Sequence, residues 1–383
     1  MNPGLKVAVV SAYPFHMVDQ AHQLHKQGAL HRMITSIPHS RVGLPHEFVR
    51  TRLRWSVTRR AVTRAMPSAD SRLNRQVIRD FDRWSQSQLG DATIVNGLSG
   101  FATNTLEAAA ARGATVFCDR GSWHILEQKR VLDEEADRIG VPRVYFDPFI
   151  VDRELREYQF AHSILVPSEP ARQSFIRRGL DANRILKVPY GVDVSAFSPA
   201  EGQRTPGAIV SVATVGLRKG HQHLVQAFRM LATQNANLTL VGAINPEWHK
   251  RLDLNHPQIR ITGPVPRQRV IREFQRASVF VLTSLEEGLA LVIGQAMACG
   301  LPVIATEATG ASELISDGIE GLILPGPPDA PAIARALDSL LSDPERMRAM
   351  GAEGRSKVEK FGGWDRYGRQ LVRAFCDSWS SAQ

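Results

Sequence analysis

Residues 279–305 read VFVLTSLEEGLALVIGQAMACGLPVIA, and this stretch decides the fold. It opens with a short apolar run at 279–282 and passes through two acids and a glycine, Glu286, Glu287 and Gly288. A longer apolar segment follows, and a second short run ends it at 302–305. Short apolar runs that alternate with longer helical patterns are typical of βαβ units with parallel strands. The two acids are therefore expected where a strand ends and a helix begins.

The same alternation extends over the whole chain. We predict strands at residues 7–10, 93–96, 115–118, 163–167 and 184–188, and a second series at 208–213, 238–241, 259–262, 279–282, 302–305 and 321–324. Between the two series, residues 198–207 form a polar stretch with two prolines and two glycines, which is typical of a linker. The pattern predicts an α/β protein with two doubly wound domains that face a central cleft.

Composition narrows the class of protein. The chain has 383 residues, of which 43% are hydrophobic and 22% charged, as expected for a globular protein of two domains. No run of 18 apolar residues predicts a membrane-spanning helix, and the first residues lack the apolar core of a signal peptide. The three cysteines, Cys118, Cys299 and Cys376, are isolated. We expect a cytoplasmic protein without a disulfide framework or a metal site.

A phosphate site is indicated at residues 215–220, which read VGLRKG and follow a predicted strand. A helical pattern begins at His221, and the backbone N–H groups at the start of a helix favour an anion. Arg218 and Lys219 would add charge-assisted hydrogen bonds to a pyrophosphate. The alternative is a solvated turn whose cations face water.

Two further turns carry polar side chains. Residues 118–124 read CDRGSWH, and Arg120, Ser122 and His124 form a plausible polar edge to a cleft. The alternative there is a structural Asp–Arg pair with a surface histidine. At the second turn, Glu286 and Glu287 would bind hydroxyl groups of a ligand, or would only complement the dipole of the helix that follows.

These pieces together resemble the retaining GT-B glycosyltransferases of family 4. The resemblance covers essentially the whole chain and rests on an ordered set of segments: 120–124, 166–168, 189–193, 219–220, 287–297, 300–306 and 317–322. It implies two Rossmann-like domains. Residues 1–197 with 362–383 would bind the acceptor, and residues 205–361 would bind the nucleotide-sugar. Tyr367, Leu371 and Phe375 stand at helical spacing, which suits the family's terminal helix that returns to the first domain.

The resemblance also implies an activity. A sugar would pass from a nucleotide-diphosphate sugar to a hydroxyl of a glycan or lipid-linked acceptor with retention of anomeric configuration, without a metal or a cofactor. A UDP-sugar is favoured over a GDP-sugar. The rival interpretation is a catalytically inactive GT-B scaffold or partner subunit of a glycan-assembly system.

Site residues follow from the same resemblance. Lys219 would contact the donor phosphates, Glu287 would face the donor sugar and Gln295 the ribose. The donor set is Thr214, Gly216, Arg218, Lys219, Glu287, Gly288, Leu289, Ala290, Leu291 and Gln295. The acceptor set is Tyr13, Phe15, His16, Arg120 and Ser122. The catalytic set is Glu287, His124 and Lys219.

The chain departs from the family pattern at three places. Gln295 stands where the family has a second Glu, and a neutral amide would weaken donor binding by roughly 1–2 kcal/mol. Thr214 stands where an Arg is usual, and Arg218 is the candidate substitute. Residues 11–16 read SAYPFH in place of a Gly-rich loop, so the acceptor is left open.

Arginine gathers in residues 41–83, where eleven arginines stand against four acids. This segment would face anionic lipid at the inner face of a membrane or a polyprenyl-diphosphate acceptor, or it is only a solvated helical face. Nucleic acid is not favoured as a partner, because aromatic residues are few and no nucleic-acid motif is present.

Overall fold

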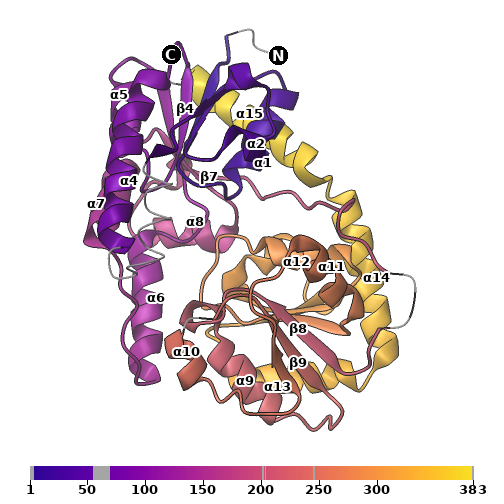
Figure 1. The fold of residues 1–383 in the computed structure, drawn as a ribbon. Coiled ribbons are helices and arrows are strands. Elements are labelled where there is room, and N and C mark those ends of the chain that lie inside the picture. The colour runs from indigo at the N-terminus through magenta and orange to yellow at the C-terminus, as the bar shows by residue number, and fades with distance from the viewer. Residues whose placement is uncertain (1–3, 55–69, 201, 203, 245, 382–383) are drawn as a thin grey trace.

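A computed structural model of the chain describes residues 4–54, 70–200, 202, 204–244 and 246–381. It contains two parallel β-sheets with flanking helices, and the two sheets lie in separate halves of the molecule (Figure 1). The class predicted from the sequence, α/β with two doubly wound sheets, is confirmed.

The first sheet has seven strands in the order β3-β2-β1-β4-β5-β6-β7. The strands are β1 (Val7–Ser11), β2 (Leu30–Thr35), β3 (Val49–Thr51), β4 (Ile94–Leu98), β5 (Thr115–Asp119), β6 (Ser163–Val166) and β7 (Ile185–Lys187). The helices of this half are α1 (Met17–Lys26), α2 (His39–Val42), α4 (Asp70–Ser85), α5 (Thr103–Ala110), α6 (Ile125–Arg138), α7 (Pro148–Phe160) and α8 (Glu169–Ile176).

The second sheet has six strands in the order β10-β9-β8-β11-β12-β13. They are β8 (Ala208–Val212), β9 (Asn237–Val241), β10 (Ile259–Ile261), β11 (Val279–Leu282), β12 (Val303–Thr306) and β13 (Gly321–Leu324). The helices are α9 (His221–Arg229), α10 (Pro246–Arg251), α11 (Arg267–Arg276), α12 (Leu291–Ala298), α13 (Ala330–Leu341) and α14 (Pro344–Lys360). Both sheets reverse their strand order beside the first strand of the sheet, the position where doubly wound proteins bind ligands.

Apolar side chains on both faces explain why these strands are central. In β1, Val7 and Val9 pack into one hydrophobic cluster and Ala8 and Val10 into another. Successive side chains of a strand point to opposite faces, so an unbroken apolar run buries a strand on both sides. The uninterrupted runs seen in the sequence are therefore the signature of strands covered by helices on each face.

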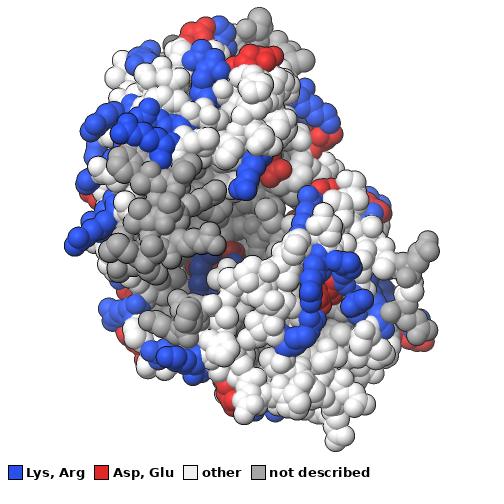
Figure 2. All heavy atoms as spheres, viewed as in Figure 1, with Lys and Arg blue, Asp and Glu red and all other residues white. Residues whose placement is uncertain are grey.

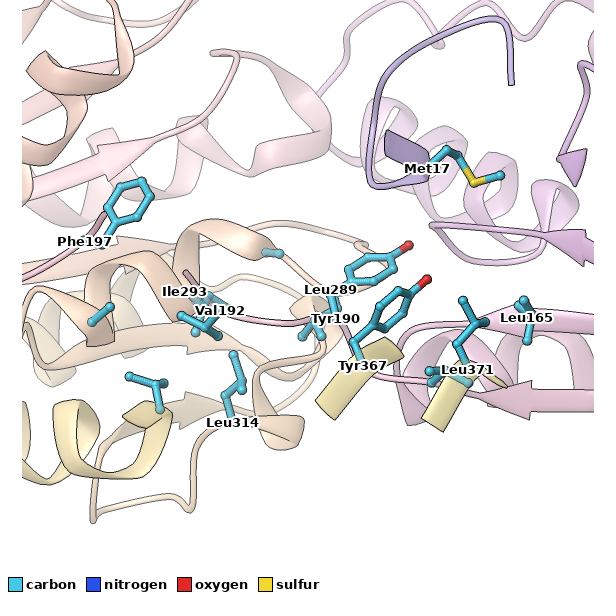
Figure 3. Packing of buried hydrophobic residues seen from close by; sticks show 14 of the residues in the cluster. Met17, Leu165, Tyr190, Val192, Phe197, Leu289, Ile293, Leu314, Tyr367 and Leu371 are labelled. Carbon is cyan, nitrogen blue, oxygen red and sulfur yellow. The ribbon is translucent and has the colours of Figure 1, made fainter. Parts of the chain in front are cut away.

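The last helix, α15 (Gly363–Ser381), returns to the first half of the molecule (Figure 1). Phe375 packs edge-on against Phe117 of β5, with ring centroids 4.6 Å apart. One hydrophobic cluster continues from this helix through Tyr190 and Val192, which follow β7, into α12 (Figure 3). Helix α15 and the segment after β7 thus join the two halves at one place.

All eleven predicted strands are present within one or two residues of their expected bounds. Two strands, β2 and β3, were not predicted. In β2, His31 and Arg32 interrupt the apolar pattern, and β3 is a three-residue edge strand among arginines. The domain limits at 197, 205 and 362 stay a prediction. Part of the arginine-rich segment, residues 55–69 with Trp55, Arg59, Arg60 and Arg64, lies outside the described residues.

Candidate active site

The carboxyl ends of the strands from the two sheets face each other. On the second sheet, β8 leads into the short 3-10 helix η5 (Leu217–Lys219), and β11 leads into the loop 283–290. On the first sheet, β1 leads into the loop 12–16 and β5 into the loop 120–124. Figure 2 shows the surface hollowed between the two halves. Ligands of doubly wound proteins bind at such strand ends.

The two loops of the second sheet hold each other in place. Leu285 N–H donates to the Arg218 carbonyl at 2.9 Å, and the Thr283 hydroxyl donates to the Lys219 carbonyl at 3.1 Å. Gly220 adopts φ +63°, and a Cβ there would strike the Thr283 carbonyl oxygen. Only glycine satisfies both demands, so the pattern VGLRKG encodes a tight turn onto the start of α9.

Two cations and two carboxylates meet on these loops. Arg218 pairs with Glu286 through Nε and with Glu287 through Nη2, the latter at 3.0 Å, and Lys219 pairs with Glu287. Burial works against the charge on Arg218, but Glu287 and Glu286 outweigh it and raise the pKa of the guanidinium. Both cations keep exposed surface, 36% for the Arg218 side chain and 19% for Lys219. They are therefore within reach of an anionic ligand in the cleft.

The first half of the molecule touches this loop directly. A Cβ on Gly288 would lie 2.5 Å from the carbonyl carbon of Gly121 and 2.9 Å from Cγ of Pro167. The hydroxyl of Ser168 donates to the Gly288 carbonyl. The halves thus meet at backbone contact distance beside the acids, and a side chain at position 288 would separate them.

Glu286 is fully buried between the halves. Ser122 donates to its Oε2 at 2.5 Å and Gln128 to its Oε1 at 2.6 Å, both from the first half. Burial raises the pKa of this carboxyl, but Arg218 and the bonds from Ser122 and Gln128 outweigh burial and hold the pKa below its ordinary value. Glu286 is therefore an ionised group that both halves bind.

Residues 197–357 match the model of a protein family described as glycosyl transferases group 1. We refer to this matched segment, residues 197–357, as the group 1 domain, because of its similarity to that family. Among curated relatives, a GDP-mannose-dependent monoacylated alpha-(1-6)-phosphatidylinositol monomannoside mannosyltransferase of Corynebacterium glutamicum is 31% identical over 208 residues, 48% of this chain and 54% of that protein. A D-inositol 3-phosphate glycosyltransferase of Xylanimonas cellulosilytica is 28% identical over 52% of this chain and 53% of that protein. The chain spans about half the length of the curated relatives it matches.

Solved structures establish the GT-B fold around the group 1 domain. Sucrose-phosphate synthase from Thermosynechococcus elongatus superposes with a TM-score of 0.72 at 18% identity, over 98% of this chain and 99% of that chain. Anabaena HepE in complex with UDP-glucose superposes with a TM-score of 0.69 at 14% identity, over 97% of this chain and 99% of that chain. At these identities the likeness concerns the fold alone.

The structure places the other predicted donor residues on both sides of the ion-pair cluster in the group 1 domain. Thr214 is exposed at the end of β8, and Gly216 N–H donates to Nδ1 of His221 at 3.4 Å. Leu289 and Ala290 are buried, and the Ala290 N–H is engaged by the Thr309 carbonyl at 3.2 Å. Leu291 and Gln295 are half-buried on α12.

Among the predicted acceptor residues, His16 lies deepest. It is buried, its Nε2 contacts Oδ1 of Asp119 at 2.7 Å, and its Nδ1 contacts the hydroxyl of Tyr190 at 3.2 Å. Gln20 and Asn96 donate to the other oxygen of Asp119 at 2.9 and 3.2 Å. Although burial raises the pKa of Asp119, His16 and the two amides outweigh it and lower the pKa. The sequence did not single out this polar cluster, because its members come from four separate segments.

Tyr13 and Phe15 belong to the same loop as His16, residues 12–16. The Tyr13 hydroxyl donates to Asn74 at 2.8 Å, and its ring stacks edge-on against Phe101 at 5.2 Å. Phe15 is 63% exposed and adopts φ +32°, a conformation that costs free energy for a residue with a side chain. Its exposed ring lies beside Tyr13, with ring centroids 6.2 Å apart.

Two predicted residues do not point into the cleft. Arg120 donates to the Trp123 carbonyl at 3.0 Å and to Gln128 at 2.8 Å, and it forms an ion pair with Glu154 at 3.2 Å. The sequence left open a structural pair between Asp119 and Arg120, and in the structure the acid of that pair is Glu154. His124 caps α6 by accepting from Leu126 N–H at 3.2 Å.

His124 also packs between Tyr158 and Phe175, with ring centroids 4.9 and 5.1 Å away. Burial and the charges of Arg178 and Arg120 lower its pKa to about 4, so the ring is neutral at pH 7. This position does not fit the catalytic role suggested by the sequence, because the ring is enclosed by the first half. We leave His124 out of the proposed reaction.

The described residues contain neither a cluster of metal ligands nor a membrane-spanning helix. No group of three His, Cys, Asp or Glu is arranged to hold a metal ion in the part of the chain that the structure describes. Over those same ranges, each helix is too short or too polar to cross a bilayer.

Proposed function

We propose that the chain is a retaining glycosyltransferase that moves a sugar from a nucleotide-diphosphate sugar to a hydroxyl of a glycan or lipid-linked acceptor, without a metal. The observation that carries the proposal is the cluster of Arg218, Lys219 and Glu287 on the two strand ends of the group 1 domain, directly opposite the first half. Cations beside a helix start suit a pyrophosphate, and a carboxylate suits sugar hydroxyls.

Donor binding would exchange ion pairs. In the ligand-free cluster, Glu287 neutralises both Lys219 and Arg218. A pyrophosphate that enters beside α9 competes for the two cations, and Glu287 is released to accept hydrogen bonds from the donor sugar. Ser284, which donates to Glu287 at 3.0 Å, would keep the carboxylate oriented during this exchange.

The reaction breaks the bond between the anomeric carbon and the diphosphate oxygen. Arg218, Lys219 and the N–H groups at the start of α9 stabilise the negative charge that develops on the leaving group. The acceptor oxygen attacks the oxocarbenium-like carbon on the face that the diphosphate leaves, which retains configuration. The acceptor proton passes to the departing phosphate oxygen, so no protein base is required. Close contact between the halves would exclude water and limit donor hydrolysis.

The proposal extends to the nucleotide base of the donor and to the acceptor. UDP is our first choice, ahead of GDP, although the Corynebacterium glutamicum relative is named for GDP-mannose. His16, Tyr13 and Phe15 would contribute to the acceptor side, since they lie on the loop that faces the group 1 domain. Ser122 contacts Glu286 in this structure, so its part in acceptor binding rests on the sequence resemblance alone.

A basic surface supports an acceptor carried by an anionic membrane. Arg72, Arg79 and Arg83 are exposed on α4, whereas Arg52 and Arg75 form ion pairs. Figure 2 shows Lys and Arg side chains over the side of the first half where α4 lies. We propose peripheral contact with anionic lipid at the cytoplasmic face. Salt-sensitive co-sedimentation with phosphatidylglycerol vesicles tests it, and equal pelleting with neutral vesicles would retire the idea.

The rival proposal is a GT-B scaffold without activity, and Gln295 is the observation that favours it. The decisive experiment incubates the protein in EDTA with UDP-glucose, GDP-mannose and their common analogues, with and without simple sugar acceptors. Turnover of one donor, with the α-anomeric configuration kept in the product by NMR, is expected. Absence of turnover with every donor would favour the scaffold, and inversion would remove the retaining mechanism.

A further inference from the structure

Glu286 and Glu287 are adjacent acids with different surroundings. Among the described residues, the Glu287 carboxylate contacts groups of its own half: Arg218, Lys219 and Ser284. Glu286 shares Arg218 with it but takes its remaining hydrogen bonds from Ser122 and Gln128 across the domain contact. One carboxylate therefore belongs to the cluster that would meet the donor, and the other bridges that cluster to the opposite half.

The bridge continues into the first half. Gln128, on α6, accepts from Nη2 of Arg120 at 2.8 Å, and Arg120 pairs with the buried Glu154 at 3.2 Å. One chain of ion pairs and hydrogen bonds thus joins Glu154, Arg120, Gln128, Glu286 and Arg218. Arg120 donates to Gln128, Gln128 donates to Glu286, and Glu286 also accepts from Arg218, so the bridge forms only when the halves are in contact.

Because Glu286 is isolated from solvent, its hydrogen bonds depend on the contact between the two halves. A buried carboxylate is costly unless cations and donors surround it. In the described part of the chain, Glu286 has one partner in its own half, Arg218, and two in the first half, Ser122 and Gln128. When the halves separate, Glu286 loses those two partners and gains water. The ion pair between Glu286 and Arg218 is then exposed to solvent, and solvated ion pairs are weak.

We propose that Glu286 is a positioning residue that fixes Arg218 toward the donor phosphates only when Ser122 and Gln128 close on it. The role rests on the proposed glycosyltransferase function and assigns a task to an acid that this reaction does not otherwise use. It links domain closure to leaving-group stabilisation: the open enzyme binds the nucleotide, and the closed enzyme also orients the guanidinium for bond cleavage.

The test is a double-mutant cycle of Glu286→Gln and Ser122→Ala. For each variant, kcat for hydrolysis of UDP-glucose and of GDP-mannose is measured, together with the Kd of UDP and of GDP. The matched control is Glu135→Gln, because Glu135 on α6 is also a buried carboxylate that contacts the other half, through His223 at 2.7 Å, and among the described residues its contacts do not include Arg218. All rates are expressed per folded protein, measured by thermal unfolding.

We expect Glu286→Gln to lower kcat by about tenfold, since it removes a charge-assisted bond, while the Kd of the nucleotide changes by less than about threefold. Ser122→Ala should lower kcat about threefold in the wild-type background and have no further effect beside Glu286→Gln, because coupled residues are not additive. Glu135→Gln should leave kcat within about twofold of wild type.

Three results would overturn the role: additive effects in the cycle, an equal loss of kcat in Glu135→Gln, or a Glu286→Gln variant whose kcat per folded protein is unchanged. An active wild type with any of these refutes only the positioning role. A wild type that turns over neither donor overturns the proposed function, and this role with it.

Discussion

Replacing Gly288 by alanine perturbs the contact between the two halves at its closest point. The added Cβ would lie 2.5 Å from the carbonyl carbon of Gly121, whereas an unstrained carbon–carbon contact needs about 3.5 Å. Relief therefore requires a separation of about 1 Å, and overpacking of this kind costs about 1–3 kcal/mol. This free energy would favour separation of the halves, and it corresponds to a change of about 5–150-fold in the closed-to-open ratio.

The assay compares donor turnover and nucleotide binding in Gly288→Ala. Because only the closed form is productive, kcat/KM should fall by about one to two orders of magnitude, in line with that ratio. The Kd of UDP should change little, since the added Cβ meets Gly121 and Pro167 of the first half rather than Arg218 or Lys219. Gly354→Ala is the matched control, because a Cβ there meets nothing closer than 3.7 Å. Turnover in Gly288→Ala within threefold of the control would refute the reasoning.

Two further predictions concern single residues. Burial holds the pKa of His124 at about 4 in the folded chain, against an ordinary value of 6.5, so the unfolded chain binds a proton more readily and the free energy of unfolding falls as the pH drops from 6.5 toward 4. His124→Asn keeps a capping group, and between pH 7.5 and pH 5 its free energy of unfolding in urea titrations should fall by roughly 2 kcal/mol less than that of the wild type. An identical fall in both proteins would show that His124 is not responsible. Gln295→Glu should tighten UDP binding by roughly 1–2 kcal/mol, about 5–30-fold by calorimetry, if position 295 faces the ribose, and weaker binding would place that side chain elsewhere.

The fold could be predicted from the sequence because the buried strands are continuous apolar runs. Runs such as Val279–Leu282 are apolar at every position, which only a strand covered on both faces requires. The strands that were missed, β2 and β3, lie toward one edge of the first sheet, where polar side chains are tolerated and the apolar pattern fades.

The site was predictable only within each loop. Glycine spacing and adjacent charges pointed to Arg218, Lys219 and Glu287, which the structure brings together. No local pattern could show that Ser122 would bond to Glu286, because that contact joins residues 164 positions apart. The catalytic role suggested for His124 has a related explanation. A histidine that follows a strand suits both a cleft and a helix cap, and the packing of its ring against Tyr158 and Phe175 distinguishes these two environments.

The central claim is that Arg218 and Lys219 form the phosphate site of a nucleotide-sugar donor. Its most direct test is a thermal-shift panel of UDP, GDP, ADP and TDP and their common sugars in EDTA, on the wild type, Lys219→Ala and the exposed-site control Lys360→Ala. The account predicts stabilisation by one nucleotide in the wild type and in Lys360→Ala, and its loss in Lys219→Ala. No stabilisation by any nucleotide, or full stabilisation of Lys219→Ala, would contradict it.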